Sequence, residues 1–199
     1  MLSWSRSAFN DCVVLDDGST DKTVDIAKQF QCRVFPRKSD PNAFGANIRL
    51  ELEEHAAYDW CFHADADELI DANMLEKVTH WIKPNSPDRK ENVVAFKFPR
   101  YNPNLWPNDK DYQIRLVDRR YVGWRRAVHP EPILKRSQRP IDEWETVGGR
   151  TVKYCQTLDM HPLIHLQYFR SKELREATRQ RWARLEALTG VKPPTETVL

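Results

Sequence analysis

Two aspartates separated by one residue, Asp65 and Asp67, follow shortly after the apolar run at residues 60–62. If the chain turns at this point, both carboxylates can converge on one cation and supply the hard oxygen ligands that Mg²⁺ and Mn²⁺ prefer. Such a cation would take its remaining ligands from phosphates and water. Acidic residues are also common where strands end, so an ordinary turn explains the pair at least as well when it is taken alone.

A second acidic run, residues 16–21 (DDGSTD), follows the apolar run at residues 12–15. Turn formation and helix capping explain its composition when it is considered by itself. Together the two acidic runs support a binding site more strongly than either run alone. We expect both at the carboxyl ends of strands, on one edge of one sheet and roughly one strand apart. A carboxylate of the first run can accept hydrogen bonds from a base or ribose, while a metal at the second holds a diphosphate. The pair of runs therefore predicts a nucleotide site.

The elements that would position these carboxylates alternate between strands and helices over residues 1–84. Short apolar runs predict strands at residues 12–15, 33–35 and 60–62, the first followed by Gly18 and the second stopped by Pro36. Apolar residues at helical spacing predict helices at residues 21–31, 45–57 and 71–82, with Ser19 or Thr20 capping the first. This alternation is typical of a parallel, doubly wound sheet, in which ligands bind at the carboxyl ends of the strands.

The pattern of apolar and polar residues changes after Pro84. Short, partly alternating runs separated by Pro, Asn and Asp predict mixed or antiparallel strands at residues 93–98, 112–117, 121–124 and 133–135. An amphipathic helix is predicted at residues 171–188. We expect a single domain over residues 1–199, with a nucleotide-binding half at 11–84, an acceptor and catalytic half at 85–170 and a C-terminal helix at 171–189.

Composition narrows the class of protein. The 199 residues carry a formal net charge of +2, which gives no support for a nucleic-acid partner. The four cysteines lie far apart, so buried thiols are expected rather than a zinc site or a disulfide framework. No apolar run approaches the roughly 18 residues of a membrane span, and the first ten residues lack a signal-peptide core. We expect a cytoplasmic protein, with peripheral association with a membrane left open.

The acidic motifs resemble those of a known enzyme family. Residues 13–23 (VVLDDGSTDKT) resemble the first acidic motif of the family 2 glycosyltransferases. Residues 62–68 (FHADADE) resemble their Asp-x-Asp motif, in the subgroup that reads Asp-Ala-Asp-Glu, and residues 45–47 match a small-residue stretch that opens a helix. The resemblance is dense over residues 11–84 and continues more thinly to residue 188.

The resemblance implies an α/β fold of the GT-A type: three α/β/α layers around a mostly parallel sheet, with a smaller mixed region in the C-terminal half. It also implies a metal-dependent, inverting transfer of a sugar from a nucleoside-diphosphate-sugar. By matched position, Asp16 and Asp17 would contact the base and ribose, Asp65 would contact the ribose or the metal, and Asp67 would ligate the metal. The metal would be Mn²⁺ or Mg²⁺.

The second half of the chain resembles the same subgroup more loosely. Residues 115–120 (RLVDRR), Gly123 and residues 128–131 (VHPE) resemble its Arg-Leu-Phe-Arg, Gly and Val-His-Glu pattern, but Pro130 is inserted between His129 and Glu131. Proline restricts the backbone on both sides of its nitrogen, so the direction of Glu131 departs from the pattern. We hypothesise that Glu131 is the catalytic base and His129 a third metal ligand. The alternative is that both side chains only satisfy a loop.

Several other side chains allow two interpretations of their role, one structural and one functional. Basic residues gather between Arg115 and Arg139, where a solvated strand face and a site for phosphates or an acidic acceptor both remain open. Trp106 and Trp124 could stack on a sugar or pack in the core. His161 and His165 could support the site or be hydrogen-bonded in the core.

The leading interpretation is an enzyme that glycosylates an unidentified acceptor, whether a glycan, a lipid-linked molecule or a protein. The alternative is a catalytically weak or inactive domain that binds a nucleotide or glycan within a larger assembly. It is favoured by the short segment before Asp11, in which the first strand expected for this family does not fit. A metal-dependent phosphohydrolase would need more His and Asp ligands than residues 1–84 offer.

Overall fold

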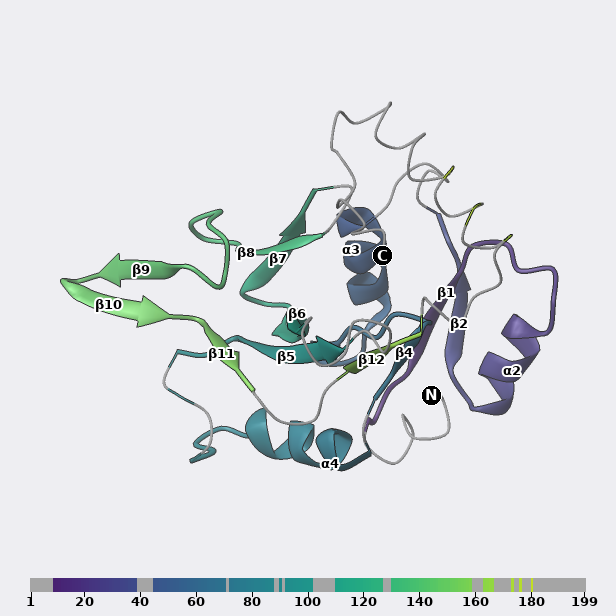
Figure 1. Cartoon of the computed structure of the whole chain (residues 1–199), viewed down its shortest axis with the longest axis horizontal. Helices are drawn as coiled ribbons and strands as arrows, with labels where there is room; N and C mark the ends of the chain where they lie inside the picture. Colours follow the sequence, from purple (N-terminus) through teal and green to yellow (C-terminus); the bar gives the residue numbers. More distant parts are fainter. Residues whose placement is uncertain are drawn as a thin grey trace.

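The computed structural model describes residues 9–38, 45–70, 72–87, 90, 92–101, 110–126, 130–158 and 163–166, together with residues 173, 176 and 180. A mixed six-stranded sheet lies at the centre of this part of the chain (Figure 1). Its strand order is β3-β6-β5-β12-β4, with β11 also paired to β5. The strands are β3 (Trp60–Phe62), β4 (Glu68–Leu69), β5 (Ala95–Tyr101), β6 (Lys110–Asp118), β11 (Cys155–Thr157) and β12 (Leu163–His165).

The first two strands of the chain form a separate parallel pair. β1 (Val13–Asp16) and β2 (Arg33–Pro36) are joined by helix α2 (Thr23–Gln29), and their register runs from Val13 opposite Arg33 to Asp16 opposite Pro36. This unit confirms the first strand–helix–strand step of the predicted alternation. Helix α2 begins later than predicted, and the Asp21 carboxylate accepts a hydrogen bond from the Thr23 N–H at 2.9 Å, so Ser19 and Thr20 do not cap it.

Helices cover both faces of the central sheet (Figure 1). Helix α4 (Ala72–Trp81) lies on one face, and helix α3 (Ala46–His55) lies on the other. Neighbouring residues of a strand point to opposite faces, so Phe96 packs toward α4 whereas Ala95 packs in a separate cluster with Ala46 of α3. The central sheet thus lies between helices α3 and α4 (Figure 1).

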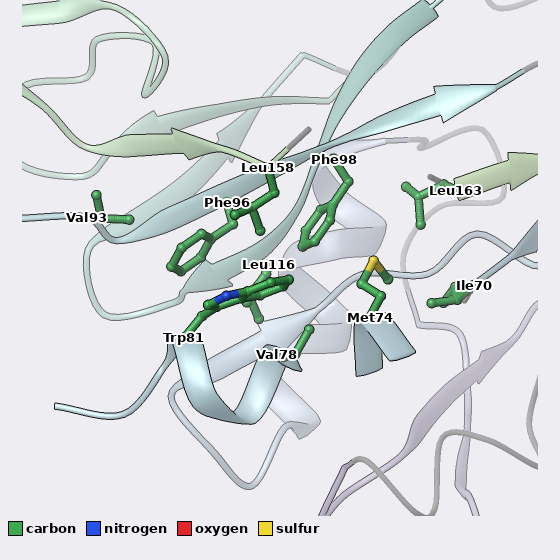
Figure 2. Packing of buried hydrophobic residues seen from close by; sticks show 10 residues of the cluster. All are labelled: Ile70, Met74, Val78, Trp81, Val93, Phe96, Phe98, Leu116, Leu158 and Leu163. Carbon is green, nitrogen blue, oxygen red and sulfur yellow. The ribbon is translucent and has the colours of Figure 1, made fainter. Parts of the chain in front are cut away.

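The core on the α4 side is rich in aromatic side chains (Figure 2). Trp81 of α4 lies with its ring centroid 6.1 Å from those of both Phe96 and Phe98 of β5. Met74 and Val78 of α4 are also fully buried in this cluster. Burying a large apolar side chain contributes roughly 1.5–3 kcal/mol, so this layer fixes α4 firmly on the sheet.

Two hairpins complete the structure. The antiparallel pair β7 (Val122–Arg125) and β8 (Glu131–Leu134) packs beside α3, and the pair β9 (Trp144–Val147) and β10 (Arg150–Lys153) projects away from the sheet (Figure 1). Gly148 and Gly149 form the turn of the second hairpin with φ of +58° and +78°. Glycine adopts such values without steric cost, which suits a tight hairpin turn.

The structure differs from the sequence prediction in strand pairing. We expected residues 60–62 to join a parallel sheet with residues 12–15, but β3 pairs antiparallel with β6, with Phe62 opposite Leu116. Apolar runs identify strands without identifying their neighbours, because every strand offers the same backbone donors and acceptors. Of the predicted C-terminal helix, residues 173, 176 and 180 are helical and the remaining positions lie outside the described residues.

Candidate active site

The Asp65–Asp67 segment forms a turn between β3 and β4. The Glu68 N–H donates to the Asp65 carbonyl oxygen at 3.0 Å, and the Leu166 N–H donates to the Asp67 carbonyl oxygen at 2.7 Å. The chain thus turns where the sequence suggested, and β12 anchors the turn from the side. The Asp65 side chain is 44% exposed and Asp67 is half-buried. Both carboxylates therefore lie close to the surface at the carboxyl end of β3.

Arg115 of β6 lies directly beside this turn. Its Nη2 donates to Asp65 Oδ2 at 2.6 Å, and its Nε donates to Glu68 Oε2 at 3.0 Å. Nη2 also bonds Glu68 Oε1, so the guanidinium grips the Glu68 carboxylate at two points. Burial alone would lower the pKa of Arg115, but the charges of Asp65 and Glu68 outweigh it and the pKa is raised. Arg115 is therefore a fixed positive charge under the turn.

A second guanidinium approaches Asp65 from helix α3. Arg49 Nη2 lies 3.3 Å from Asp65 Oδ1, and its guanidinium carbon lies 4.9 Å from the centre of the Trp124 ring. Burial and the nearby charge of Arg115 lower the pKa of Arg49, while the surrounding carboxylates act against that change. An arginine remains charged under such shifts. The two oxygens of Asp65 are thus each bonded to an arginine.

Behind Arg49, a buried polar group joins α3 to the sheet and the first hairpin. Glu53 Oε1 accepts the Trp124 indole N–H at 2.6 Å and lies 2.9 Å from His63 Nε2. Burial lowers the pKa of His63, and the hydrogen bond to Glu53 only partly opposes this effect. The imidazole is therefore neutral near pH 7, with its proton on Nε2 toward Glu53. Trp124 belongs to this packed group, which agrees with the alternative that it packs in the core. Its buried ring offers no free face to a sugar.

The surroundings of Asp65 hold more negative than positive side chains. Four carboxylates, those of Glu53, Asp65, Asp67 and Glu68, interact with the two guanidinium groups of Arg49 and Arg115. This excess of negative charge suits a divalent cation. Within the described ranges, no three His, Cys, Asp or Glu side chains gather as a complete metal site. Two carboxylates can hold a cation such as Mg²⁺ when a diphosphate and water supply the other ligands, and metal ligation by Asp65 and Asp67 stays a prediction.

The first acidic cluster lies at the end of β1, as predicted. Both Asp16 carboxylate oxygens lie 3.2 Å from the Ser19 N–H, and a hydrogen bond from the Ser19 side chain lowers the pKa of Asp16. Asp17 Oδ1 accepts a hydrogen bond from Arg37 Nη1 at 3.0 Å. Helix α3, which carries Arg49 toward Asp65, also packs against β1. In the described part of the chain β1 pairs with β2 and β3 pairs with β6, so the expectation that the two acidic clusters lie one strand apart in one sheet was wrong.

The proposed base lies at the start of β8. The Glu131 carboxylate bonds to Arg125 Nε, and Arg126 Nε lies 3.5 Å from its Oε2. The backbone carbonyl of Arg126 accepts the N–H of Ala46 at 3.2 Å, which links this strand end to the start of α3. The catalytic role of Glu131 stays a prediction, and so does metal ligation by His129, which lies outside the described residues together with Trp106 and His161.

Sequence reasoning missed the side chains that hold the turn. Arg49, Glu53, Glu68 and Arg115 are all buried although their side chains are charged. A usable signal was present, because Arg115 interrupts the apolar run at residues 114–117 and Glu68 stands just before Leu69 and Ile70. A charge inside a predicted buried strand needs a partner and so points to an ion pair.

Comparison with known proteins identifies the family of the chain. A family model described as glycosyl transferase family 2 matches residues 7–156, a range that includes both acidic clusters, Arg115 and Glu131. No curated protein matches the chain. In the described part of the chain, no helix is long and apolar enough to cross a membrane. Since the matched range covers more than half of the sequence, the chain belongs to glycosyl transferase family 2, whose GT-A α/β fold agrees with the layered sheet, and it is a glycosyltransferase.

Proposed function

We propose that this enzyme transfers a sugar, with inversion, from a nucleoside-diphosphate-sugar to an acceptor hydroxyl. The observation that carries the proposal is the turn of Asp65 and Asp67 at the carboxyl end of β3, in surroundings with more carboxylates than guanidinium groups. Asp65 and Asp67, with His129 as a third ligand, would hold Mn²⁺ or Mg²⁺. A bound divalent cation would supply Lewis-acid stabilisation of the departing diphosphate.

The nucleoside end of the donor would lie toward β1. Asp16 and Asp17 offer carboxylate oxygens near the surface at the end of that strand, and such oxygens accept hydrogen bonds from ribose hydroxyls and base N–H groups. The turn at Gly18, whose φ is +87°, brings the Ser19 N–H back onto Asp16 and so fixes that carboxylate. This arrangement supports nucleoside recognition by the first acidic cluster.

Inverting transfer requires removal of the acceptor proton as the bond to the diphosphate breaks. Glu131 is the residue that we propose as the base. Its carboxylate is held by Arg125 and Arg126, so the proposal requires it to meet the acceptor hydroxyl while one oxygen keeps an arginine partner. Glu131→Gln should leave donor binding intact and abolish transfer, whereas unchanged turnover would remove Glu131 from this role.

Thermal unfolding with a panel of nucleoside diphosphates, with and without Mn²⁺, tests donor binding. A ligand that binds only the folded protein raises its apparent stability by mass action, by about 2.7 kcal/mol at a hundredfold excess over Kd. We expect one nucleotide to stabilise the protein in a manganese-dependent manner, and Asp67→Asn to remove that dependence.

A matched control is Asp59→Asn, which changes an exposed aspartate near the other end of β3. It should leave the nucleotide effect unchanged. If no nucleotide stabilises the wild type, the proposed donor site is wrong.

A further inference from the structure

An ion pair excluded from water lies directly beneath the exposed carboxylate of Asp65. The side chains of Glu68 and Arg115 are 0% and 4% exposed, whereas that of Asp65 is 44% exposed. The pair comes from two strands that do not touch in the sheet order, since β4 pairs with β12 and β6 lies between β3 and β5. The pairing of β3 with β6 brings Asp65 near Arg115, whereas Glu68 reaches Arg115 through its side chain.

Burying such a pair brings no clear gain in stability. Removing two charges from water costs several kcal/mol per ion, and their attraction restores this only when the geometry is good and other hydrogen bonds help. Here the fork of Arg115 makes three hydrogen bonds, two to Glu68 and one to Asp65. If the planar guanidinium turned toward another partner, the buried Glu68 carboxylate would lose both hydrogen bonds from Arg115 and keep the longer contact with the Asp65 N–H at 3.3 Å. These contacts are suited to holding the Arg115 guanidinium, and with it the Asp65 carboxylate, in one orientation.

We propose that Glu68 and Arg115 are positioning residues for Asp65. Glu68 fixes the plane of the Arg115 guanidinium, and Arg115 then fixes the inner oxygen of Asp65, so that the rest of this carboxylate faces the donor site. The contact from Arg49, at 3.3 Å, is longer than the 2.6 Å contact from Arg115 and gives the weaker constraint. This inference rests on the proposed function, because it assigns a purpose to the orientation of Asp65.

Glu68 itself has no surface from which to touch a ligand. Its side chain is fully buried, and its backbone pairs with His165 of β12. Any effect of Glu68 on donor binding must therefore pass through its contacts with Arg115 and with the Asp65 N–H, which lies 3.3 Å from Glu68 Oε2. That property allows positioning to be separated from direct contact.

A double-mutant cycle on nucleotide affinity tests the proposal. The Kd for UDP, GDP and dTDP, each with Mn²⁺, is measured by calorimetry for wild type, Glu68→Gln, Asp65→Asn and the double variant. Loss of a residue that orients a ligand-holding side chain costs about 10- to 100-fold in affinity, so Glu68→Gln should weaken binding by that factor. In the Asp65→Asn background, Glu68→Gln should weaken binding no further, because the carboxylate that it orients is already gone.

A residue needed only for stability would give a different pattern. Measured where each variant is folded, its Kd would equal that of the wild type, or its effect would add to that of Asp65→Asn; either result overturns the proposal. If Glu68→Gln does not fold, Arg115→Lys enters the same cycle, since lysine keeps the charge and loses the fork.

The matched control is Arg100→Lys, which alters an arginine paired with Asp111 at 2.6 Å on β5 and β6, where both side chains are partly exposed. Its nucleotide affinity should equal that of the wild type. A wild type that binds none of the three nucleotides contradicts the proposed function, and the positioning role falls with it. A wild type that binds one of them while Glu68→Gln binds equally well overturns the positioning role alone.

Discussion

The indole N–H of Trp124 donates to Glu53 Oε1 at 2.6 Å, which ties the β7–β8 hairpin to helix α3 from the inside. The same helix presents Arg49 to Asp65, and Arg49 lies over the Trp124 ring. The position of α3 on the sheet, and with it one of the two guanidinium groups at the candidate site, thus depends on a hydrogen bond between buried side chains.

The first prediction concerns this bond. Trp124→Phe should lower the free energy of unfolding by about 1–3 kcal/mol, because Glu53 loses a donor in a place that water does not reach. The control Trp144→Phe changes a tryptophan that is 58% exposed and should alter stability by less than about 0.5 kcal/mol. Urea denaturation measures both. Equal effects of the two substitutions would show that the Trp124 hydrogen bond contributes nothing.

The second prediction concerns Asp11. Its carboxylate accepts hydrogen bonds from Arg33 Nη2 at 2.6 Å and from the Ala57 N–H at 2.9 Å, and the bond from Arg33 chiefly lowers its pKa below the usual 3.8. A lowered folded pKa means that the contribution is complete above about pH 4 and disappears as the pH falls through the folded value.

Asp11→Asn should therefore cost about 1 kcal/mol at pH 7, a figure kept low because Arg33 is partly exposed, and the difference from wild type should shrink at lower pH. Denaturation curves at several pH values measure it. Asp142→Asn, which alters an exposed aspartate, should change little at any pH. A cost that is constant down to pH 2 would contradict the ionic origin.

The third prediction concerns the thiols. Cys12 and Cys32 stand at corresponding ends of β1 and β2 with their Sγ atoms 2.9 Å apart. Burial raises the pKa of both Cys61 and Cys155 to about 12, so these two thiols are protonated at pH 8 and react slowly.

We expect oxidised glutathione, which is itself reduced to two thiols, to join Cys12 to Cys32 and leave Cys61 and Cys155 unmodified. Peptide mapping by mass spectrometry identifies the bond, and Cys12→Ser provides the control in which it cannot form. A disulfide that includes Cys155 would show that burial does not protect that thiol.

The fourth prediction compares two glycines with similar backbones. Gly18 has φ of +87° and Gly149 has φ of +78°, and a methyl group added to either meets no atom within 4 Å. Each alanine substitution should thus cost about 1–2 kcal/mol through backbone strain alone. Only Gly18→Ala should also weaken nucleotide binding, because Gly18 forms the turn that presents Asp16 and Asp17. Calorimetry separates the two effects, and equal nucleotide affinities would argue against a donor contact by these aspartates.

The sequence was sufficient to predict most helices and strands. Helix α3 (Ala46–His55) and helix α4 (Ala72–Trp81) lie within the predicted ranges, since apolar spacing and flanking breakers determine such elements locally. The β9–β10 hairpin was not predicted, although Gly148 and Gly149 between two short runs are a hairpin signal. Strand partners could not be predicted, because they depend on contacts between distant parts of the chain.

The candidate site was predictable only at its surface. Asp65 and Asp67 follow from their types and spacing, whereas the residues beneath them depend on tertiary structure. Arg115 lies 50 residues from Asp65 in the sequence and 2.6 Å away in space. Its partner Glu68 belongs to the Asp-Ala-Asp-Glu motif, in which only the two aspartates were given roles. The pairing of Glu68 with Arg115 became visible only from its burial in the structure.

The central claim, donor turnover at the Asp65–Asp67 turn, is tested most directly by release of nucleoside diphosphate from a panel of nucleotide-sugars with Mn²⁺ present, where water takes the sugar in place of the acceptor hydroxyl. We expect the wild type to release the diphosphate of one donor, and Asp67→Asn to release it at least about tenfold more slowly, while Asp59→Asn matches the wild type. Equal rates for the wild type and Asp67→Asn, or release from no donor in the panel, would contradict the account.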